Sequence, residues 1–253
     1  MTEWWLAYLG IGALVGFLAG LLGIGGGAII VPMLVWVFTA QGLPAEHLLH
    51  LALGTSMATI FFTSASSMRA HHQHGSVDWQ IARRITPGIL AGSFGAAWAA
   101  GILPTRPLAM IFTALVFYAA ISMLFDLKPK HTRELPGAPG MFAAGAGIGV
   151  ASSLLAAGGA FLTIPFLAWC NVPLRRAIGT AAAVGFPIAV AGSAGYLMQG
   201  YINLPALALI VVTSMLTAPL GARTAYRVPV KRLRMIFALM MLGLALRMLA
   251  SLW

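Results

Sequence analysis

Charged residues are scarce in this sequence, and acidic residues are the scarcest. Only 8% of the 253 residues are charged while 60% are hydrophobic, a balance that no soluble core of this length hides from water. Cation pumps and proton-coupled carriers usually need a carboxylate at mid-membrane depth, and none is available here. All five acidic residues lie at the ends of apolar runs or in loops: Glu3, Glu46, Asp78, Asp126 and Glu134.

Cysteines and catalytic combinations are equally sparse. Cys170 is the only cysteine, which excludes a disulfide framework and a multi-cysteine metal site, and we expect it to be a small buried residue. There is no HExxH motif and no buried aspartate pair, and the only histidines outside loops are His47 and His50, near a segment end. We therefore expect no catalytic residues, no metal site and no cofactor.

Apolar runs of membrane-spanning length recur along the whole chain, with no long polar insert between them. Each can cross about 30 Å of hydrocarbon, so the sequence predicts an all-α, polytopic membrane protein. The N-terminus, MTEWWLAYLG, lacks the basic region and cleavage site of a signal peptide, so we expect the first run to stay in the mature protein. The net charge of +10 then reports membrane topology and not a nucleic-acid partner.

The sequence repeats itself once. LAMIFTALVFYAAISML at 108–124 matches LRMIFALMMLGLALRML at 233–249, an offset of 125 residues that also pairs ALGTSMA at 52–58 with AIGTAAA at 177–183. An offset of 133 pairs GGGAIIVP at 25–32 with GGAFLTIP at 158–165. We divide the chain into a first transmembrane half (1–127), a cytoplasmic linker (128–138) and a second transmembrane half (139–253), each half with five apolar segments. Those of the first half lie at about 5–22, 26–39, 47–68, 79–101 and 105–126.

The first two segments of a half are too long together for one crossing, since about 35 residues of helix would measure about 50 Å. We expect them to leave and return on the same side, as two spans or as a re-entrant hairpin. Each half then makes an odd number of net crossings, which inverts one half relative to the other. With both termini outside, 13 of the 15 basic residues fall in inside loops, and only Arg106 and Arg247 lie outside.

Glycine-rich breaks separate the first two segments of each half, GIGGGA at 23–28 and AAGGA at 156–160. Each precedes a short apolar helix that we expect Pro32 or Pro165 to cap. Because the N-terminus of a half-helix presents unpaired N–H groups and a positive dipole end, each break is a candidate anion site near the midplane. The predicted substrate-binding residues are the amide donors Gly25, Gly26, Gly27, Gly158, Gly159 and Ala160 and the hydroxyl groups of Thr55, Ser56 and Thr180.

Simpler roles compete with this interpretation. A hydroxyl in a membrane helix often bonds only to the carbonyl four residues earlier, and glycine often serves close helix packing. A spacing of four suits packing, whereas three consecutive glycines break a helix. We expect Gly12, Gly16, Gly145 and Gly149, which are spaced by four residues, to serve only helix packing.

Two charged features have open roles. RAHHQHGSVDW at 69–79 holds three histidines beside an aspartate in a loop, which suggests a metal or pH-sensing site, although a solvated basic turn is the better interpretation. The arginine pairs either concentrate anions at a cytoplasmic mouth or only set the topology. They are Arg83, Arg84, Arg175 and Arg176.

The duplicated stretches GFLAGLLGIGGGAIIVPML and GVASSLLAAGGAFLTIPFL, each followed by GTS or GTA on the next segment, resemble the TauE/SafE family of sulfite and sulfonate exporter-like membrane proteins. The resemblance covers both repeats and nearly the whole chain. It implies transport of a small sulfur-containing anion, such as sulfite, sulfoacetate or a related organosulfonate, across the bacterial inner membrane. The second copy departs from the family pattern with AAGGA in place of GIGGG, so we expect two unequal binding loops.

These features together predict a transporter, and more specifically an exporter, of a small anion. Export needs no ion coupling, because an interior-negative potential favours anion exit by about 2.3 kcal/mol per charge per 100 mV. We expect alternating access by rocking of the halves, although a gated channel would use the same parts. The alternatives are a transporter or channel for another solute or a metal ion, and a non-transporting membrane protein. The expected partners are the anion and membrane lipid, with the oligomeric state left open and a homodimer among the alternatives.

Overall fold

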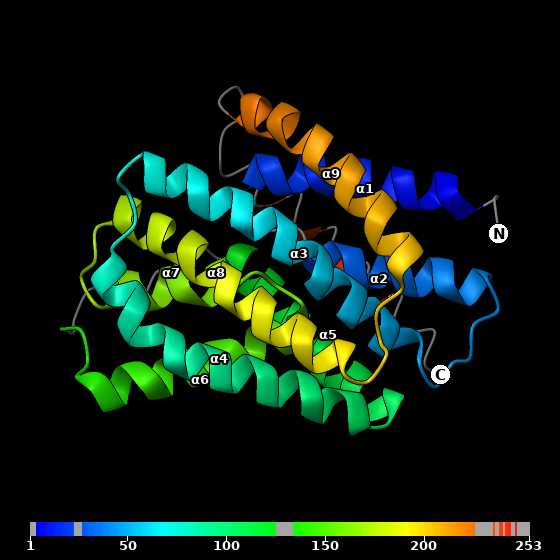
Figure 1. Cartoon of the computed structure of the whole chain (residues 1–253), viewed down its shortest axis with the longest axis horizontal. Coiled ribbons are helices and arrows are strands. Elements are labelled where there is room, and N and C mark those ends of the chain that lie inside the picture. Colours follow the sequence, from blue (N-terminus) through cyan, green and yellow to red (C-terminus); the bar gives the residue numbers. More distant parts are fainter. Residues whose placement is uncertain are drawn as a thin grey trace.

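The structure, a computed structural model, describes residues 4–22, 27–124 and 134–225, together with residues 235, 238, 239, 241–243 and 246 of a later helix. These residues form α-helices joined by short turns, without a β-strand among them (Figure 1). The helices are α1 (Trp5–Leu22), α2 (Gly27–Ala40), α3 (Leu48–Gln73), α4 (Trp79–Ile102), α5 (Thr105–Leu124), α6 (Ala138–Leu155), α7 (Ala160–Trp169), α8 (Leu174–Leu197) and α9 (Leu204–Ala225). Five of them, α3, α4, α5, α6 and α8, are long and apolar enough to cross a membrane. The predicted all-α, polytopic membrane class is confirmed.

The helices of the first half begin and end within a few residues of the predicted segments, except at the end of α3. The sequence predicts an end near residue 68, followed by a histidine loop. Instead α3 continues to Gln73, so His71 and His72 are helical and the loop prediction is wrong. No glycine lies between residue 68 and Gly75, whose φ of 62° gives the left-handed conformation in which helices commonly end.

Pro32 and Pro165 do not cap the short helices, contrary to the prediction. Each is the sixth residue of its helix, inside α2 and α7. Both helices end two residues before a left-handed residue instead, Gly42 with φ 73° after α2 and Asn171 with φ 58° after α7. A proline inside a helix removes one backbone donor, which membrane helices tolerate where neighbouring helices cover the gap.

The short helices fold back against the helices that precede them. Tyr8 near the start of α1 accepts a hydrogen bond of 2.7 Å from the amide of Gln41, just after α2, so this pair enters and leaves at the same end of the bundle. α7 has only ten residues, about 15 Å of helix, which is half of the hydrocarbon thickness. α6 and α7 therefore form a hairpin whose tip lies near the middle of the membrane.

Most of the basic residues in the described part of the chain gather at one end of the bundle, which we call the basic end. Arg176 at the start of α8 lies 3.8 Å from Asp78 at the start of α4, and a surface pocket joins Asp78 to Pro136 just before α6. The exposed arginines there are Arg69, Arg83, Arg84, Arg175 and Arg176, while Arg106 lies at the opposite end.

α3 and α8 form the central pair and run in opposite directions. α8 begins at the basic end, where it contacts the turn before α4. α3 begins at the opposite end, where it contacts the turn before α9. These two equivalent helices therefore point in opposite directions, as the predicted inverted repeat requires.

Glycines let α6 pack backbone to backbone against α4. A side chain at Gly145 would collide with the backbone of Ile85, and one at Gly149 would collide with the backbone of Ile89. α6 belongs to the second half and α4 to the first, so this contact joins the halves (Figure 1). The packing role predicted for these two glycines is confirmed.

The same contact occurs a second time between α1 and α9. A side chain at Gly12 would collide with the backbone of Ile210, and one at Gly16 would collide with the backbone of Ser214. Both α9 residues lie 125 positions after their counterparts in α4, and both α1 glycines lie 133 positions before theirs in α6. The two halves are thus interlocked by two equivalent glycine interfaces.

We expect Gly149→Leu to destabilise the folded bundle, because the new side chain would meet the backbone of α4. Overpacking of this kind costs about 1–3 kcal/mol and lowers the thermal unfolding temperature of the purified protein in detergent. Gly147→Leu is the matched control, since the same side chain on the same helix faces open space. Equal unfolding temperatures of the two variants would contradict the close packing of α6 on α4.

Candidate functional site

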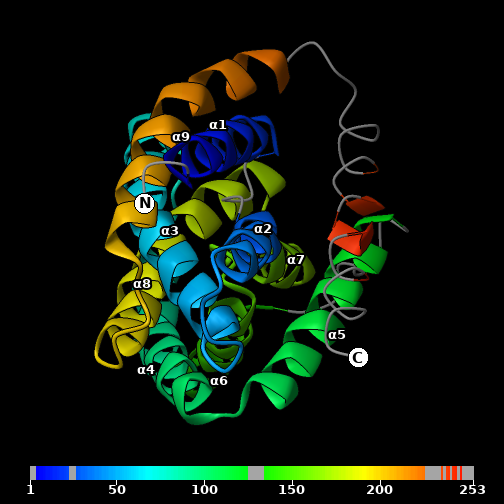
Figure 2. The same ribbon diagram turned by 90° about the vertical axis from the view of Figure 1, so that its right-hand side faces the viewer.

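Gly27, at the described end of the first break, meets the second break near the centre of the bundle. A side chain at Gly27, the first residue of α2, would collide with the carbonyl group of Ala156, the residue after α6. Ile60 contacts both Gly27 and Gly158, and Gly185 lies against the carbonyl oxygen of Gly158. Ile60 and Gly185 are the middle residues of α3 and α8, so the breaks lie at about half the membrane depth. Figure 2 shows α2 and α7 in the interior of the bundle.

The second break is a turn that contains two left-handed residues. Ala156 ends α6 with φ 47°, and Gly159 precedes α7 with φ 77°. The amide of Gly159 donates to Ala157 at 2.7 Å, and its carbonyl oxygen accepts from the amide of Thr163 at 2.9 Å. A side chain at Gly159 would be strained by the positive φ and would also collide with Ile188. The backbone conformation of this position therefore favours glycine, and any other side chain would also displace the end of Ile188.

The start of α7 collects hydrogen-bond donors. The amides of Ala160 and Phe161 precede the first bonds of the helix, which Leu162 and Thr163 make to the carbonyl oxygen of Gly159. The Thr163 hydroxyl is fully buried and bonds to none of the described groups. Its oxygen lies 3.8 Å from the position of a Cβ atom on Gly159, so it faces the start of the helix. Free donors at the positive end of a helix dipole form an anion site.

A second unpaired hydroxyl lies on the other side of the break. Ser153, in the last turn of α6, is fully buried, and its hydroxyl has no partner among the described groups. It faces Gly192 of α8, where a Cβ atom would lie 3.0 Å from the Ser153 oxygen. A buried hydroxyl without a partner is destabilising, so two of them at one break need an explanation, and a bound ligand supplies one.

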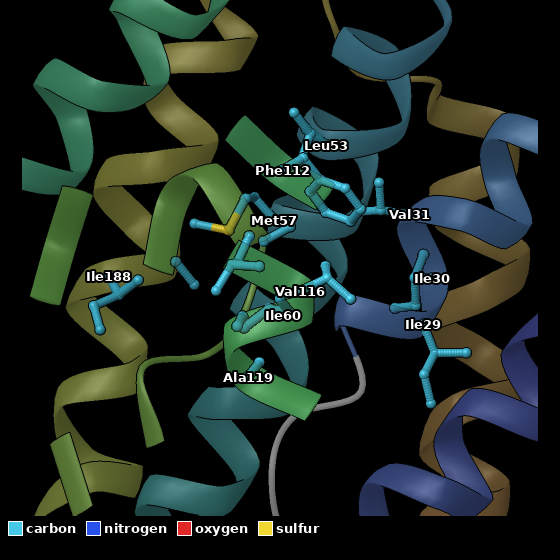
Figure 3. Close-up of a cluster of buried hydrophobic side chains, with 14 of the residues drawn as sticks. Ile29, Ile30, Val31, Leu53, Met57, Ile60, Phe112, Val116, Ala119 and Ile188 are labelled. Atoms are coloured by element: carbon cyan, nitrogen blue, oxygen red, sulfur yellow. The ribbon is translucent and has the colours of Figure 1, made fainter. Parts of the chain in front are cut away.

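Apolar side chains surround the breaks. Figure 3 shows Met57 and Ile60 of α3 gathered with Phe112 and Val116 of α5, while Ile188 of α8 lies farther to one side. All five are almost completely buried. A site that excludes water strengthens hydrogen bonds to a charged ligand. Ile60 lies between the two breaks, so the site is closed in this conformation.

The structure brings together those predicted site residues that lie at the breaks. Gly27 meets Ala156, the first residue of the turn that continues through Gly158 and Gly159 to Ala160 at the start of α7. Ser56 reaches this point through a hydrogen bond of 3.4 Å from its hydroxyl to the carbonyl oxygen of Gly27. The other predicted glycines, Gly25 and Gly26, lie outside the described residues.

Thr55 and Thr180 make contacts elsewhere. Both are fully buried, and each hydroxyl oxygen accepts a hydrogen bond from a backbone amide. The donor to Thr55 is Asn203 and the donor to Thr180 is Asp78, each at 2.9 Å. The two threonines therefore face the turns at opposite ends of the central pair, and the structure does not bring them to the breaks.

Three residues at the breaks were not predicted from the sequence: Thr163, Ser153 and Ile60. The sequence prediction compared the two halves and favoured hydroxyl residues at positions that match between them. At the offset of 133, Thr163 corresponds to Ile30 and Ser153 to Gly20, so neither has a matching hydroxyl. A search for hydroxyl groups within one turn of either break would have found both.

The histidines near the basic end do not form a metal site. No group of three histidine, cysteine, aspartate or glutamate side chains that could hold a metal ion occurs in the described part of the chain. His71 pairs with Ser76 at 3.1 Å, and His72 accepts from the indole of Trp79 at 3.1 Å. Cys170 is buried, as predicted. The carboxylates that the structure describes, Glu46, Asp78 and Glu134, lie outside the helices.

Comparisons with known proteins cover nearly the whole chain. The family described as Sulfite exporter TauE/SafE matches residues 8–248. A probable membrane transporter protein of Haemophilus influenzae is 36% identical over 252 residues, covering 94% of this chain and 95% of that protein. Probable membrane transporter proteins of Bacillus subtilis and Methanocaldococcus jannaschii are 29% and 26% identical, covering 85% and 90% of this chain and 88% and 89% of their own. No solved structure matches the chain.

The conformation of Gly159 gives a prediction. Gly159→Ala places a Cβ atom at positive φ and against Ile188, so we expect it to lower the free energy of unfolding by about 1–3 kcal/mol. Gly158→Ala is the matched control, because its Cβ atom would lie at an ordinary contact distance of 3.4 Å from Ile60. Thermal unfolding of the two purified variants measures the difference. If both variants were equally stable, the left-handed conformation of Gly159 at the second break would be contradicted.

Proposed function

We propose that this chain, which belongs to the sulfite exporter TauE/SafE family and is a membrane transporter, carries a small sulfur-containing anion such as sulfite or an organosulfonate out of the bacterial cell. The anion binds where the two helix breaks face each other. The family description and the names of the relatives support transport, whereas the chemistry of the breaks supports an anion as the substrate.

The observation that carries this proposal is the buried, unpaired hydroxyl of Thr163 at the start of α7. Sulfite and sulfonate groups present three oxygen atoms that share a negative charge and accept hydrogen bonds. Thr163 donates to one oxygen, and the amides of Ala160 and Phe161 donate to the others. Ser153 approaches from the opposite side of the turn. The apolar surroundings leave these donors without competition from water.

The same surroundings disfavour a cation. A divalent metal ion prefers carboxylate ligands. The described carboxylates all lie outside the helices, away from the breaks. The unpaired amides and hydroxyl groups at the second break thus favour negative charge.

The charge distribution supports outward transport across the bacterial inner membrane. The positive-inside rule places the basic end in the cytoplasm, with both termini outside. Exposed arginines at that end raise the local concentration of anions at the cytoplasmic mouth. The membrane potential then favours anion exit by about 2.3 kcal/mol per charge per 100 mV, without a coupled ion.

Flux into proteoliposomes tests the proposal. We expect radiolabelled sulfite or a sulfonate to move faster than sulfate, and the direction of net flux to reverse when the clamped membrane potential is reversed. Gly26→Leu should insert normally and abolish the flux, because Gly26 is among the amide donors predicted from the sequence. No flux of any of these anions at either potential would refute the proposed substrate class.

Thr163→Val tests the site itself. Loss of a hydrogen bond to a charged ligand costs about 1.5–3 kcal/mol, so we expect flux at low substrate concentration to fall about 10- to 100-fold. Thr163→Ser keeps a hydroxyl and should retain most of the flux. Ser93→Ala is the control, since Ser93 is also a buried hydroxyl with no described partner, but it lies against Gly149 where α4 packs on α6. Equal flux in the Thr163→Val and Ser93→Ala variants would show that Thr163 does not bind the anion.

A further inference from the structure

Two turns close the opposite ends of the central α3–α8 pair in the same way. At the basic end, the backbone amide of Asp78 donates to the hydroxyl oxygen of Thr180 at 2.9 Å. At the opposite end, the backbone amide of Asn203 donates to the hydroxyl oxygen of Thr55, also at 2.9 Å. Both threonines are fully buried. We call these contacts the Thr180 latch and the Thr55 latch.

The latches occupy equivalent positions of the repeat. Thr180 follows Thr55 by 125 residues, and Asn203 follows Asp78 by the same 125. Each latch also joins the two halves of the chain. Thr55 lies in the first half and bonds a turn of the second half, whereas Thr180 lies in the second half and bonds a turn of the first half. The structure therefore uses one contact twice, once at each end.

A glycine brings each turn against its helix. Gly179 lies against the backbone of Ser76, and Gly54 lies against the carbonyl group of Tyr201, and a side chain at either glycine would collide with the turn. Each glycine directly precedes a latch threonine, which gives the repeated Gly-Thr pair of the sequence a structural role. The glycine leaves room for the turn to approach the helix, and the threonine hydroxyl accepts a hydrogen bond from the turn.

Each latched residue also caps the helix that it precedes. The Asp78 carboxylate accepts from the amides of Gln80 and Ile81 at the start of α4, at 3.1 and 3.2 Å. The side-chain oxygen of Asn203 accepts from the amide of Ala206 at the start of α9, at 3.0 Å. These caps hold the turn to its own helix, so a turn that leaves its latch moves together with the start of α4 or α9.

We propose that the two latches are the gates of the transporter and that they open in alternation, a proposal that rests on the proposed transport function. An anion moving between the breaks and water has to pass one end of the central pair, and a docked turn covers each end. Thr55 and Thr180 lie five residues before Ile60 and Gly185, the residues that contact the breaks. Because α3 and α8 are antiparallel, one gate lies on each side of the site.

The latches are weak contacts in an otherwise tightly packed bundle. Each turn is held by one neutral hydrogen bond and the close contact at its glycine, whereas α6 on α4 and α1 on α9 are packed backbone to backbone over more than one turn. A turn with so few contacts opens and recloses while the packed pairs stay intact. Motion that starts at the latches is thus the least costly way to uncover the ends of α3 and α8.

The two gates differ in charge. At the basic end, Arg176 lies 3.8 Å from Asp78, and 64% of the Arg176 side chain is exposed, so an anion arriving from water can compete with Asp78 for it. At the opposite end, the ring of Tyr201 packs against those of His47 and His50, with centroids 5.6 and 4.9 Å apart. The basic gate is therefore the one that responds to anions.

Hydrogen–deuterium exchange of the protein in lipid nanodiscs, without any substrate, tests the gates. The method reports on backbone amides, and the relevant peptides cover residues 74–79 and 199–204. Thr180→Val removes one acceptor, so we expect exchange at 74–79 to rise about fivefold or more and exchange at 199–204 to fall. Thr55→Val should give the opposite pattern.

The fall at the far end is the sign of alternation, because loss of a merely structural bond loosens only its own partner. Thr59→Val is the matched control and should change neither peptide, since this buried hydroxyl bonds within α3 to the carbonyl oxygen of Thr55 at 2.9 Å. Thr180→Ala and Thr55→Ala serve if a valine variant fails to insert. A rise in one peptide alone, a rise in both, or no change would overturn the alternating gates, whichever anion is carried.

Discussion

A backbone group in the middle of a bilayer has no water to bond, so a helix can end there only where other protein groups cover its end. Gly27, where α2 begins, and the turn between α6 and α7 both lie near that depth. Gly27 and Ala156 cover one another, Gly185 meets the carbonyl oxygen of Gly158, and Ile60 fills the space between the breaks. The same lack of water turns the amides at the start of α7 into strong donors for a charged ligand. The glycines, the apolar packing around them and the proposed anion site all follow from this constraint.

The halves are interlocked, which limits how the molecule can move. α1 of the first half lies along α9 of the second, and α6 of the second lies along α4 of the first (Figure 2). Rocking the halves as two separate bodies would pull apart both glycine-packed interfaces. Motion that begins at the docked turns before α4 and α9 leaves these interfaces intact, because each turn is held to the central pair only by the hydrogen bond from its helix-capping residue and the contact at the neighbouring glycine.

The architecture could be predicted from the sequence because apolar length, glycine spacing and charge are local signals. The helices, the packing glycines and the hairpin of α1 and α2 all follow from them. The partners of Thr55 and Thr180 could not be predicted, because they are amides 148 and 102 residues away in the chain. Thr163 was missed because its counterpart in the first half is Ile30. A comparison of the two halves favours site residues that occur in both of them and passes over a hydroxyl group that occurs in only one. The end of α3 was misplaced because the conformation of Gly75, and not hydropathy, determines it.

The position of a bound anion in a crystal of the transporter tests the site most directly. Selenite has the charge and the pyramidal shape of sulfite, and its selenium atom gives an anomalous signal that locates it. We expect an anomalous peak at the start of α7, within hydrogen-bond distance of the Thr163 hydroxyl. A peak found only beside the exposed arginines of the basic end, in protein that transports selenite, would show that the helix breaks do not bind the anion.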